Sequence, residues 1–339
     1  MKKRVCILHT GGTIGMVCSP HGYETCAGRL RHVLEELPEL QHDGMPDTDL
    51  VEMTPLLDSS NIALPEWNRI GGTIAEKYDA YDGFVVLHGT DTMAYTASAL
   101  AFQLQNLGKP VVLTGSQIPF GELRTDARDN LLTSLLLAAG GEIREVCLYF
   151  GGRLLRGVRS TKVSADALIA FDSPNYPPLA ECGIEICVRR KNLLPPPEEA
   201  FRFTPFVQHS IAVFKVFPGI RFGMLEAVVS GGLKGLVLEA FGSGNMPVAE
   251  DNGLMRFLEH AGNCGTAVVV CTQCLCGSAR PGKYAVSEKL RDKGIISGQD
   301  MTVEAAVAKL YALLTAGLAG DPLRREMEES LCGELTPQA

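Results

Sequence analysis

Two groups of glycine and hydroxyl-bearing residues could bring a nucleophilic or polarising side chain against a small ligand. The first is Thr10-Gly11-Gly12-Thr13-Ile14-Gly15, which directly follows the apolar run Val5–Leu8. Adjacent glycines lack Cβ atoms, so the backbone can turn sharply and a ligand can come close, with the Thr13 hydroxyl at the tip of the turn. Taken alone, the motif is equally well explained as an ordinary glycine-rich turn.

The second group, His88-Gly89-Thr90-Asp91-Thr92, lies where the apolar run Phe84–Leu87 meets a helical stretch that we expect to continue to about Leu107. The unpaired N–H groups and the positive dipole end of a helix N-terminus favour an anion. A hydroxyl and a carboxylate at this point could therefore hold a charged ligand. The simpler interpretation is that Asp91 or Thr92 caps the helix.

Four other patterns carry little chemistry by themselves. Asp58-Ser59-Ser60-Asn61 is typical of a turn with a helix cap, and an isolated lysine such as Lys162 is typically a solvated surface charge. Gly71-Gly72-Thr73-Ile74 repeats the letters of the first motif inside a helix-like stretch with no strand before it. The three thiols of Cys271-Thr272-Gln273-Cys274-Leu275-Cys276 lack a fourth ligand of suitable spacing, so no metal site is predicted.

The order of short apolar runs and longer helical stretches predicts βα units around parallel sheets. Ligands bind outside the carboxyl ends of the strands in such sheets, so we expect the polar residues that follow the runs to converge on one crevice. The predicted strands are Val5–Leu8, Phe84–Leu87, Val111–Leu113, Val146–Phe150, Ile211–Phe217, Gly235–Leu238 and Thr266–Val270.

The length of 339 residues predicts about two domains, at roughly 100 to 200 residues each. The periodicity fails between Arg189 and His209, where a run of three prolines indicates a linker. We expect α/β domains, each a mostly parallel sheet flanked by helices. A larger N-terminal domain over 1–190 would carry most of the candidate site, followed by a linker over 191–209 and a C-terminal domain over 210–339 that is closed by a helix from Val303 to Leu318.

The composition excludes several classes of protein. A hydrophobic fraction of 46% and a mean hydropathy of +0.10 describe a globular chain. The net charge is −8, there is one Trp, and no basic run extends beyond Lys2-Lys3-Arg4. The chain therefore lacks the cluster of positive charges with which proteins bind the phosphates of nucleic acid. No segment reaches the ~18 consecutive apolar residues of a membrane span, and the N-terminal apolar run is too short for a signal peptide. Eleven cysteines at irregular spacing indicate reduced thiols in the cytoplasm.

Together and in this order, the motifs resemble those of the L-asparaginases of the bacterial type I, cytosolic kind, over essentially the whole chain. Further similar segments are Gly22-Tyr23, Thr114-Gly115-Ser116-Gln117, Thr161-Lys162, Gly244-Asn245 and Asp300-Met301-Thr302-Val303-Glu304-Ala305. The resemblance implies hydrolysis of L-asparagine to L-aspartate and ammonia without a cofactor or a metal. It also implies a two-domain α/β fold that assembles as a homodimer or homotetramer in the cytoplasm, with no nucleic acid or membrane partner.

The resemblance implies roles for individual residues. The implied catalytic residues are Thr13, Tyr23, Thr90, Asp91 and Lys162, and the implied substrate-binding residues are Ser59, Ser60, Gly89, Thr90 and Asp91. Thr13 is the implied nucleophile, and Tyr23 lies on a loop over 15–28 that we expect to close over the substrate as a lid. Lys162 could polarise the Thr90 hydroxyl or relay a proton. A covalent intermediate on Thr13 and direct attack by water both remain open.

The two ends of the substrate would be held separately. Asp91 would pair with the α-ammonium, while Ser59 and the backbone near Gly89 and Ser60 would hold the α-carboxylate. Glutamine then arrives one methylene too long, a mismatch worth about 1 to 3 kcal/mol, so a preference for asparagine with residual glutaminase activity is predicted.

Some relatives of this kind bind asparagine at a second, regulatory site that uses an arginine near the subunit interface. Glu239 occupies the corresponding position here, and a carboxylate cannot bind a carboxylate as arginine does. Thr161, Thr272 and Cys274 still resemble parts of that site. Asn245 is the residue most expected to complete a neighbouring subunit's site.

Two alternatives remain open. An ammonia-producing subunit of a transfer-RNA-dependent amidotransferase would carry an additional N-terminal domain, whereas the first motif here begins about ten residues from Met1. A non-catalytic sensor of asparagine or aspartate would need Asp91 and Ser59 to bind the two charged ends of the ligand. It would not need two threonine hydroxyls together with Lys162.

Overall fold

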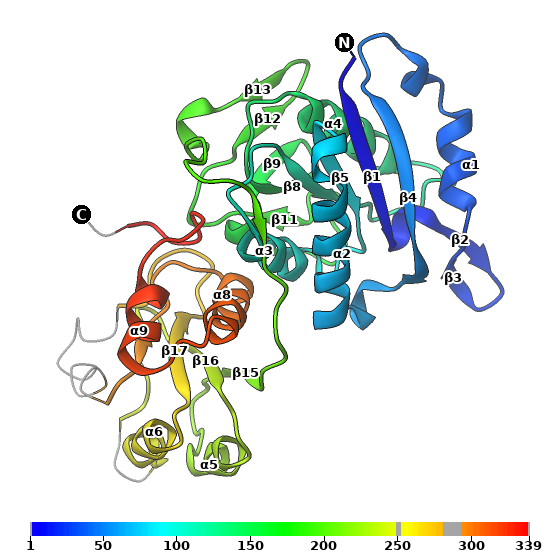
Figure 1. The fold of residues 1–339 in the computed structure, drawn as a ribbon. Helices are drawn as coiled ribbons and strands as arrows, with labels where there is room; N and C mark the ends of the chain where they lie inside the picture. The colour runs from blue at the N-terminus through cyan, green and yellow to red at the C-terminus, as the bar shows by residue number, and fades with distance from the viewer. Residues whose placement is uncertain (1, 249–251, 281–289, 291–292, 338–339) are drawn as a thin grey trace. The chain divides into compact units, whose positions relative to one another are not determined.

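The chain folds into two compact units, Met1–Pro205 and Phe206–Ala339, in a computed structural model that describes residues 2–248, 252–280, 290 and 293–337 (Figure 1). Both units are α/β, so the predicted fold class is confirmed. The division falls inside the segment predicted as a linker. That segment also contains a short strand, β14 (Arg202–Phe203), which pairs with β6 (Leu104–Gln105) in the first unit.

The first unit is built on an eight-stranded sheet with the order β13-β12-β9-β8-β7-β5-β1-β4. Five neighbouring strands are parallel: β4 (Asp47–Leu57), β1 (Arg4–Gly11), β5 (Gly83–Leu87), β7 (Val111–Thr114) and β8 (Val146–Phe150). The other three continue the sheet in antiparallel pairs: β9 (Arg153–Arg156), β12 (Ala180–Cys182) and β13 (Ile186–Val188).

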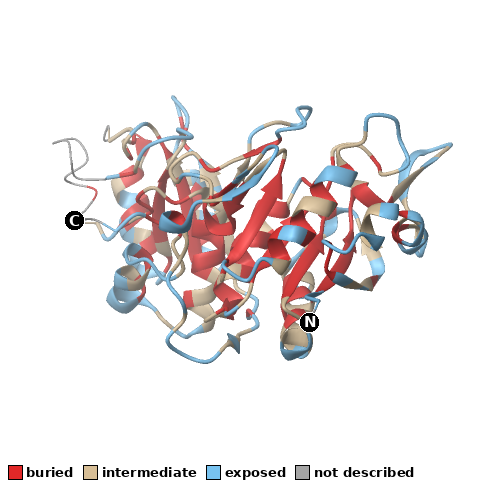
Figure 2. Ribbon diagram, turned by 90° about the horizontal axis from the view of Figure 1, so that it is seen from above, coloured by how far each residue is buried: buried red, intermediate tan, exposed pale blue. Residues whose placement is uncertain are grey.

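Helices cover both faces of this sheet, and alternate residues of each strand face opposite layers. Val5 and Val85 pack with α1 (Arg29–Glu36) and α4 (Ala127–Ala139), whereas Cys6 and Phe84 pack with α2 (Leu64–Lys77) and α3 (Met93–Gln103). The central strands are buried throughout (Figure 2). Strands covered on both faces contain nearly continuous apolar runs, which is why such runs predicted them.

One of the parallel connections has the opposite hand to the others. Going from β4 to β5 and from β5 to β7, the chain moves in the same direction across the sheet, through α2 and α3 on one face. From β7 to β8 it moves in that direction again, but through α4 on the other face. Crossovers between parallel strands are almost always right-handed, so the connection through α4 is the left-handed exception. The loop after β7 must therefore pass over the carboxyl edge of the sheet to reach α4.

The second unit is a parallel sheet of four strands, β15 (Ile211–Lys215), β16 (Gly235–Ala240), β17 (Ala267–Thr272) and β18 (Ile296–Ser297), paired in chain order. On one face, Leu236 and Val270 pack with α5 (Gly223–Ser230) and α6 (Leu254–Asn263). α8 (Val303–Thr315) and α9 (Gly320–Glu328) also contact the strands of this sheet. Among the described residues, no helix combines the length and hydropathy needed to cross a bilayer.

One long strand was not predicted, and several helices and strands end at other residues than predicted. β4 was not predicted, because it is an edge strand with alternating exposed charges such as Asp47 and Asp49 and a proline at position 55. The helix expected to reach Leu107 ends at Gln103, and β15 ends at Lys215 rather than Phe217. The helix expected from Val303 to Leu318 ends at Thr315, before Gly317 at a φ of 76°.

A fully buried ion pair in the second unit provides a test of its stability. Lys309 Nζ lies 2.6 Å from Glu334 Oε1, both side chains are 0% exposed, and Nζ also donates to the carbonyl of Met327 at 3.0 Å. Lys309→Met leaves the carboxylate buried without its cation and should lower the free energy of unfolding by about 3 to 5 kcal/mol, measured by urea denaturation. Lys309→Met with Glu334→Gln should recover at least half of that loss. No recovery in the double variant would contradict the electrostatic origin of the effect.

Candidate active site

The topology of the larger sheet marks the place where a ligand should bind. From β1 the chain passes first to β4 on one side and then to β5 on the other, so the strand order reverses between β1 and β5. Open α/β sheets bind ligands outside the carboxyl ends of the strands at such a reversal. β1 and β5 are paired up to His9 and Leu87, and Thr10 Oγ1 donates to the Leu87 carbonyl at 3.0 Å. The two motifs Thr10–Gly15 and His88–Thr92 lie at the ends of these two strands.

The backbones of the two motifs touch. Gly12 has a φ of 83°, and a Cβ built on it would lie 2.3 Å from Gly89 N and 2.5 Å from Gly89 Cα. A Cβ on Gly89 would in turn lie 2.5 Å from Ser59 Oγ. Glycine is therefore required at both positions, because no side chain fits between the three segments. Thr13 and Thr90 each follow one of the touching glycines, so both residues lie at the carboxyl ends of the parallel strands.

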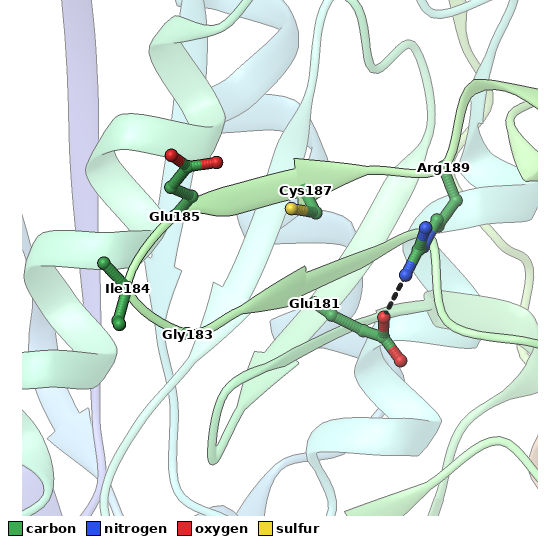
Figure 3. Close-up of a pocket in the computed structure, with 6 residues that line it drawn as sticks. All are labelled: Glu181, Gly183, Ile184, Glu185, Cys187 and Arg189. Atoms are coloured by element: carbon green, nitrogen blue, oxygen red, sulfur yellow. Dashed lines mark hydrogen bonds and ion pairs between the residues drawn. The ribbon is translucent and has the colours of Figure 1, made fainter.

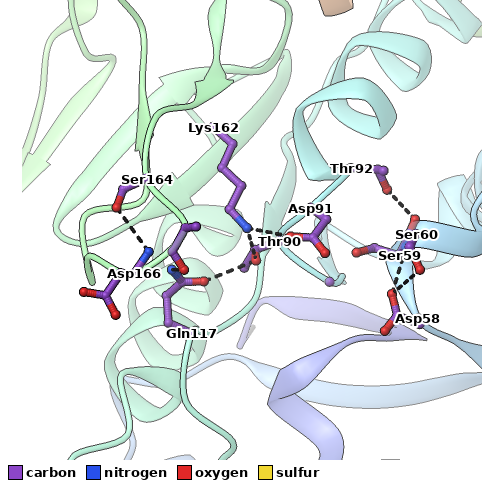
Figure 4. Close-up of polar contacts among 12 residues, drawn as sticks. Asp58, Ser59, Ser60, Thr90, Asp91, Thr92, Gln117, Lys162, Ser164 and Asp166 are labelled. Atoms are coloured by element: carbon purple, nitrogen blue, oxygen red, sulfur yellow. Dashed lines mark hydrogen bonds and ion pairs between the residues drawn. The ribbon is translucent and has the colours of Figure 1, made fainter.

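Lys162 connects the second motif to a distant part of the chain (Figure 4). Its Nζ donates to Thr90 Oγ1 at 2.8 Å and to Asp91 Oδ1 at 2.7 Å. The lysine side chain is 19% exposed, whereas the Asp91 side chain is 64% exposed. The two-stranded ladder of β10 (Thr161–Lys162) and β11 (Phe171–Asp172) holds Lys162 opposite the buried Phe171. Lys162 is thus a partly buried member of the site and not the surface charge that an isolated lysine usually is.

Gln117 is a member of this network that the sequence analysis did not select. Its Nε2 donates to the carbonyls of Ala165 and Ala167, at 3.3 and 3.2 Å, which turns its Oε1 toward Thr90. Thr90 Oγ1 lies 3.2 Å from that oxygen and 2.8 Å from the Lys162 ammonium. Because Gln117 Oε1 only accepts and Lys162 Nζ donates, the Thr90 hydroxyl donates to Gln117 and accepts from Lys162. The signal in the sequence was a polar side chain just after the strand Val111–Leu113.

Ser59 and Ser60 have different environments. Asp58 accepts from the Ser60 amide at 2.9 Å and from Ser60 Oγ at 2.8 Å, and so caps the short turn η3 (Ser59–Asn61) as expected. Ser59 is buried, and its Oγ faces Gly89. Thr92 Oγ1 donates to the Ser59 carbonyl at 2.8 Å. The expectation that Asp91 or Thr92 caps α3 is wrong, since no side-chain cap hydrogen bond is present there and both side chains are used elsewhere.

Tyr23 lies on a hairpin beside the first motif. The hairpin consists of β2 (Met16–Ser19) and β3 (Gly22–Thr25), and β3 contacts the turn η1 (Thr13–Gly15). The Tyr23 side chain is 51% exposed, and partial desolvation together with the nearby carboxylate of Glu122 raises the pKa of its phenol. Within the described residues, no hydrogen bond joins Tyr23 to Thr13.

The residues proposed for regulation and for subunit contact are divided between the units. Glu239 and Thr272 lie at the carboxyl ends of the adjacent strands β16 and β17, and Thr272 Oγ1 accepts from the Cys274 amide at 3.0 Å. Thr161 lies in the first unit, beside Lys162. Asn245 closes a tight turn through two backbone hydrogen bonds with Phe241.

Two sequence patterns to which no chemistry was assigned lie inside α2 and at the end of β17. Gly71-Gly72-Thr73-Ile74 lies inside α2. Burial raises the pKa of the Cys271 thiol to about 12, whereas Cys274 and Cys276 are exposed.

A shallow pocket of about 440 Å³ lies at the β12–β13 hairpin (Figure 3). Two of its charged residues, Arg189 and Glu181, form a hydrogen-bonded ion pair with each other. The residues that line it are Glu181, Gly183, Ile184, Glu185, Cys187 and Arg189.

Comparison with known proteins places both units in one family. Residues 4–194 match the family model described as asparaginase, N-terminal, and residues 210–327 match the glutaminase/asparaginase C-terminal domain. L-asparaginase 1 of Escherichia coli K12 is 46% identical over 338 residues, which is 99% of each chain. The crystal structure of L-asparaginase I from Vibrio cholerae has a TM-score of 0.92 and 42% identity, over 99% of this chain and 100% of that chain. The thermostable L-asparaginase from Thermococcus kodakarensis has a TM-score of 0.89 and 33% identity, with the same coverage.

The contact between Gly12 and Gly89 can be tested with a matched pair of glycines. Gly12 and Gly141 have φ values of 83° and 72°, but nothing lies within 4 Å of a Cβ on Gly141. Gly141→Ala should therefore show only the cost of a left-handed alanine, about 1 to 2 kcal/mol. Gly12→Ala adds overpacking of about 1 to 3 kcal/mol and the strain of an alanine at φ 83° and ψ 174°, a region essentially restricted to glycine, so its loss of thermal stability should be at least twice as large. Equal melting temperatures for the two variants would contradict the contact.

Proposed function

This chain belongs to the asparaginase family, and from that membership we propose that it hydrolyses L-asparagine to L-aspartate and ammonia at the carboxyl ends of β1 and β5. The observation that carries the proposal is the contact of one lysine with both Thr90 and Asp91 beside the touching glycines. A site that only binds an amino acid needs charged groups for its two ends. It does not need a second threonine hydroxyl held between an ammonium and an amide oxygen.

The site has separate groups that could bind the α-ammonium and the α-carboxylate of an amino acid. Asp91 presents a largely exposed carboxylate for the α-ammonium, while Lys162 holds one of its oxygens. Ser59 and the backbone of Gly89 suit the α-carboxylate, because they lie against each other on the buried side of the site. The hydroxyl and the amide N–H of Ser60 both donate to Asp58, so Ser60 can bind the α-carboxylate only if the substrate displaces one of these bonds. With both ends held, the side-chain amide of asparagine has a fixed reach, and glutamine fits less well.

Thr13 is the proposed nucleophile. Its oxygen forms a bond to the amide carbon, its proton passes through the site to the leaving nitrogen, and ammonia departs as the C–N bond breaks. Water then adds to the Thr13 ester and releases aspartate. Thr90 serves this second step: Lys162 polarises its hydroxyl and Gln117 orients the proton, so Thr90 can bind and orient the attacking water.

The hairpin of β2 and β3 is the proposed lid. Tyr23 is half exposed beside Glu122 and has no bond to Thr13, so a movement of the hairpin over bound substrate is needed to bring the phenol to the nucleophile. A phenol is protonated at neutral pH, and the raised pKa of Tyr23 does not change that, so the hydroxyl can pass a proton between Thr13 and the leaving nitrogen.

Four further properties are proposed from the family resemblance and the residues. The enzyme is a cytoplasmic homodimer or homotetramer, and Asn245 contributes to a neighbouring subunit's site. Glu239 stands where a regulatory site would need a cation, so asparagine should not activate the enzyme through a second site, despite Thr161, Thr272 and Cys274.

The function is tested by ammonia release from asparagine and glutamine. Wild type should hydrolyse asparagine with a hyperbolic dependence on concentration and prefer it to glutamine by about 10- to 200-fold in kcat/KM. Thr13→Ala should lose about ten-thousand-fold in kcat, since the nucleophile is gone. Thr73→Ala, in the repeated letters within α2, is the matched control and should behave as wild type. A wild type that binds asparagine without turnover would indicate a sensor. A sigmoidal dependence of rate on asparagine concentration would show that a regulatory site is present.

The lid predicts a distinct kinetic effect for Tyr23→Phe. Removal of one hydroxyl should lower kcat by about 100-fold or more while KM changes only a few-fold, because the phenol acts on the proton and not on the substrate's ends. Tyr81→Phe is the control, because Tyr81 lies just before β5, at the amino ends of the parallel strands. A rise in KM with unchanged kcat would mean that Tyr23 only binds substrate.

The covalent route is tested by trapping. Lys162→Met leaves Thr13 in place but removes the cation that polarises Thr90, so the ester on Thr13 should form faster than water cleaves it. Mass spectrometry after acid quenching should then find an aspartyl group on the peptide that contains Thr13. No adduct in Lys162→Met or Thr90→Val, under conditions where wild type turns over, would favour direct attack by water.

A further inference from the structure

A chain of hydrogen bonds runs beneath the second motif, from α2 to the peptide that precedes Thr90. Trp67 Nε1 donates to Thr96 Oγ1 at 3.1 Å, Thr96 Oγ1 lies 2.9 Å from His88 Nε2, and His88 Nδ1 lies 2.7 Å from the Gly89 carbonyl oxygen. His88 and Thr96 are 0% exposed and Trp67 is 8% exposed. None of these three side chains is among the catalytic or binding residues proposed above.

The two ends of the chain fix the direction of every bond in it. An indole N–H can only donate, and a carbonyl oxygen can only accept. Thr96 Oγ1 accepts from Trp67, so its single proton is free to point at His88 Nε2. His88 Nδ1 must then carry a proton, because a bare nitrogen lone pair 2.7 Å from the Gly89 oxygen would be repelled. The neutral imidazole protonated on Nδ1 is the form that satisfies all three bonds.

The surroundings of His88 favour that neutral form. Burial lowers the pKa of its imidazole to about 4, against the smaller opposing effect of the Gly89 carbonyl. The hydrogen bonds of the ring are made to a hydroxyl and a carbonyl, neither of which carries a charge that would compensate a buried imidazolium. His88 is therefore suited to holding one fixed geometry across the neutral pH range and not to exchanging protons.

The last bond of the chain acts on the peptide between Gly89 and Thr90. This peptide is trans, so its N–H points away from its carbonyl. The bond from His88 draws the carbonyl toward the buried ring and turns the Thr90 N–H to the other side. No partner for that N–H is found in the described part of the chain. The peptide plane also sets the start of the segment whose side chains, Thr90 and Asp91, bond to Lys162.

We propose that His88 is a positioning residue, which with Thr96 and Trp67 behind it orients the Gly89–Thr90 peptide so that the Thr90 N–H and hydroxyl face the substrate. The proposal rests on the proposed hydrolysis for its kinetic consequence. It assigns to the buried chain a role in the transition state, because misplacement of a reacting group by about 1 Å can cost about 100-fold in rate.

Two substitutions at the same buried position separate positioning from mere packing. In His88→Asn the amide can place an N–H near the position of Nδ1 and keep the bond to the Gly89 carbonyl. In His88→Gln the amide reaches toward Thr96 and leaves that carbonyl without its donor. We expect His88→Asn to retain at least about a tenth of kcat and His88→Gln to lose about 100-fold, with KM within a few-fold of wild type in both. Equal kcat losses in two folded variants would overturn the proposal.

A second pair covers the case in which His88 variants do not fold. Thr96→Ser keeps the hydroxyl and should retain kcat, whereas Thr96→Val removes it and should lower kcat by about tenfold or more with little change in KM. Equal kcat for the two variants would overturn the proposal. Trp67→Phe leaves Thr96 able to donate to His88 but less firmly oriented, so its kcat loss should be smaller than that of Thr96→Val. A kcat loss in Trp67→Phe as large as that of Thr96→Val would also contradict the assigned direction.

The tautomer can be measured without any assay. Nitrogen NMR of wild-type protein labelled at histidine, with the His88 signals assigned from their loss in a His88 variant, should show a protonated Nδ1 and a bare Nε2 at pH 7.5. A protonated Nε2 or an imidazolium would overturn the chain. If wild type releases no ammonia from asparagine, the proposed function fails, whereas the tautomer still decides whether the chain runs in the assigned direction.

Discussion

The site depends on the close approach of two backbones. Gly12 and Gly89 lie so near each other that no Cβ fits between them, and the second of them also touches the Ser59 side chain. This contact is made possible by the pairing of β1 with β5 at the reversal of the strand order, which leaves both turns on one edge. Everything else in the site, including Lys162 from a distant ladder, is arranged around these turns.

The site combines groups of opposite character on its two sides. Toward the interior, His88 and Thr96 are completely buried and exchange only uncharged hydrogen bonds, so this side keeps one protonation state across the neutral pH range. Toward solvent, Asp91 and Tyr23 are largely exposed and lie beside charged neighbours. A substrate with two charged ends and a reacting amide would meet adaptable groups at the mouth and fixed geometry at the reaction centre.

Much of the fold could be predicted from the sequence because of how the strands are buried. β1, β5, β7 and β8 each contain a continuous apolar run because helices cover both faces of the sheet, and a conspicuous polar turn follows each run. β4 escaped prediction because an edge strand alternates exposed charges with partly buried residues. Lys162 was recognised through the family resemblance and not from its own surroundings, since only the folded ladder of β10 and β11 shows that it is partly buried.

The role of Gln117 was beyond local sequence reasoning for a different reason. Its amide is oriented by carbonyls at 165 and 167, far along the chain, and sequence spacing does not reveal such contacts. The long β7–α4 loop that carries it also depends on which face α4 covers. A helical stretch after β7 gives the same sequence signal whichever face of the sheet it covers.

The left-handed connection through α4 makes the carboxyl ends of the parallel strands differ from their amino ends. The β7–α4 loop must travel across the carboxyl edge, where the Phe120 amide donates to the Ile14 carbonyl at 3.3 Å and Asp126 accepts from the amides of Gln117 and Ile118. The return from α4 to β8, over 140–145, turns back at the opposite edge, far from these contacts. Length changes and chimera junctions will therefore be tolerated at the amino edge and will disturb chemistry at the other. A designer who wishes to recombine this chain with a relative should cut it near Gly141 and leave 115–126 intact.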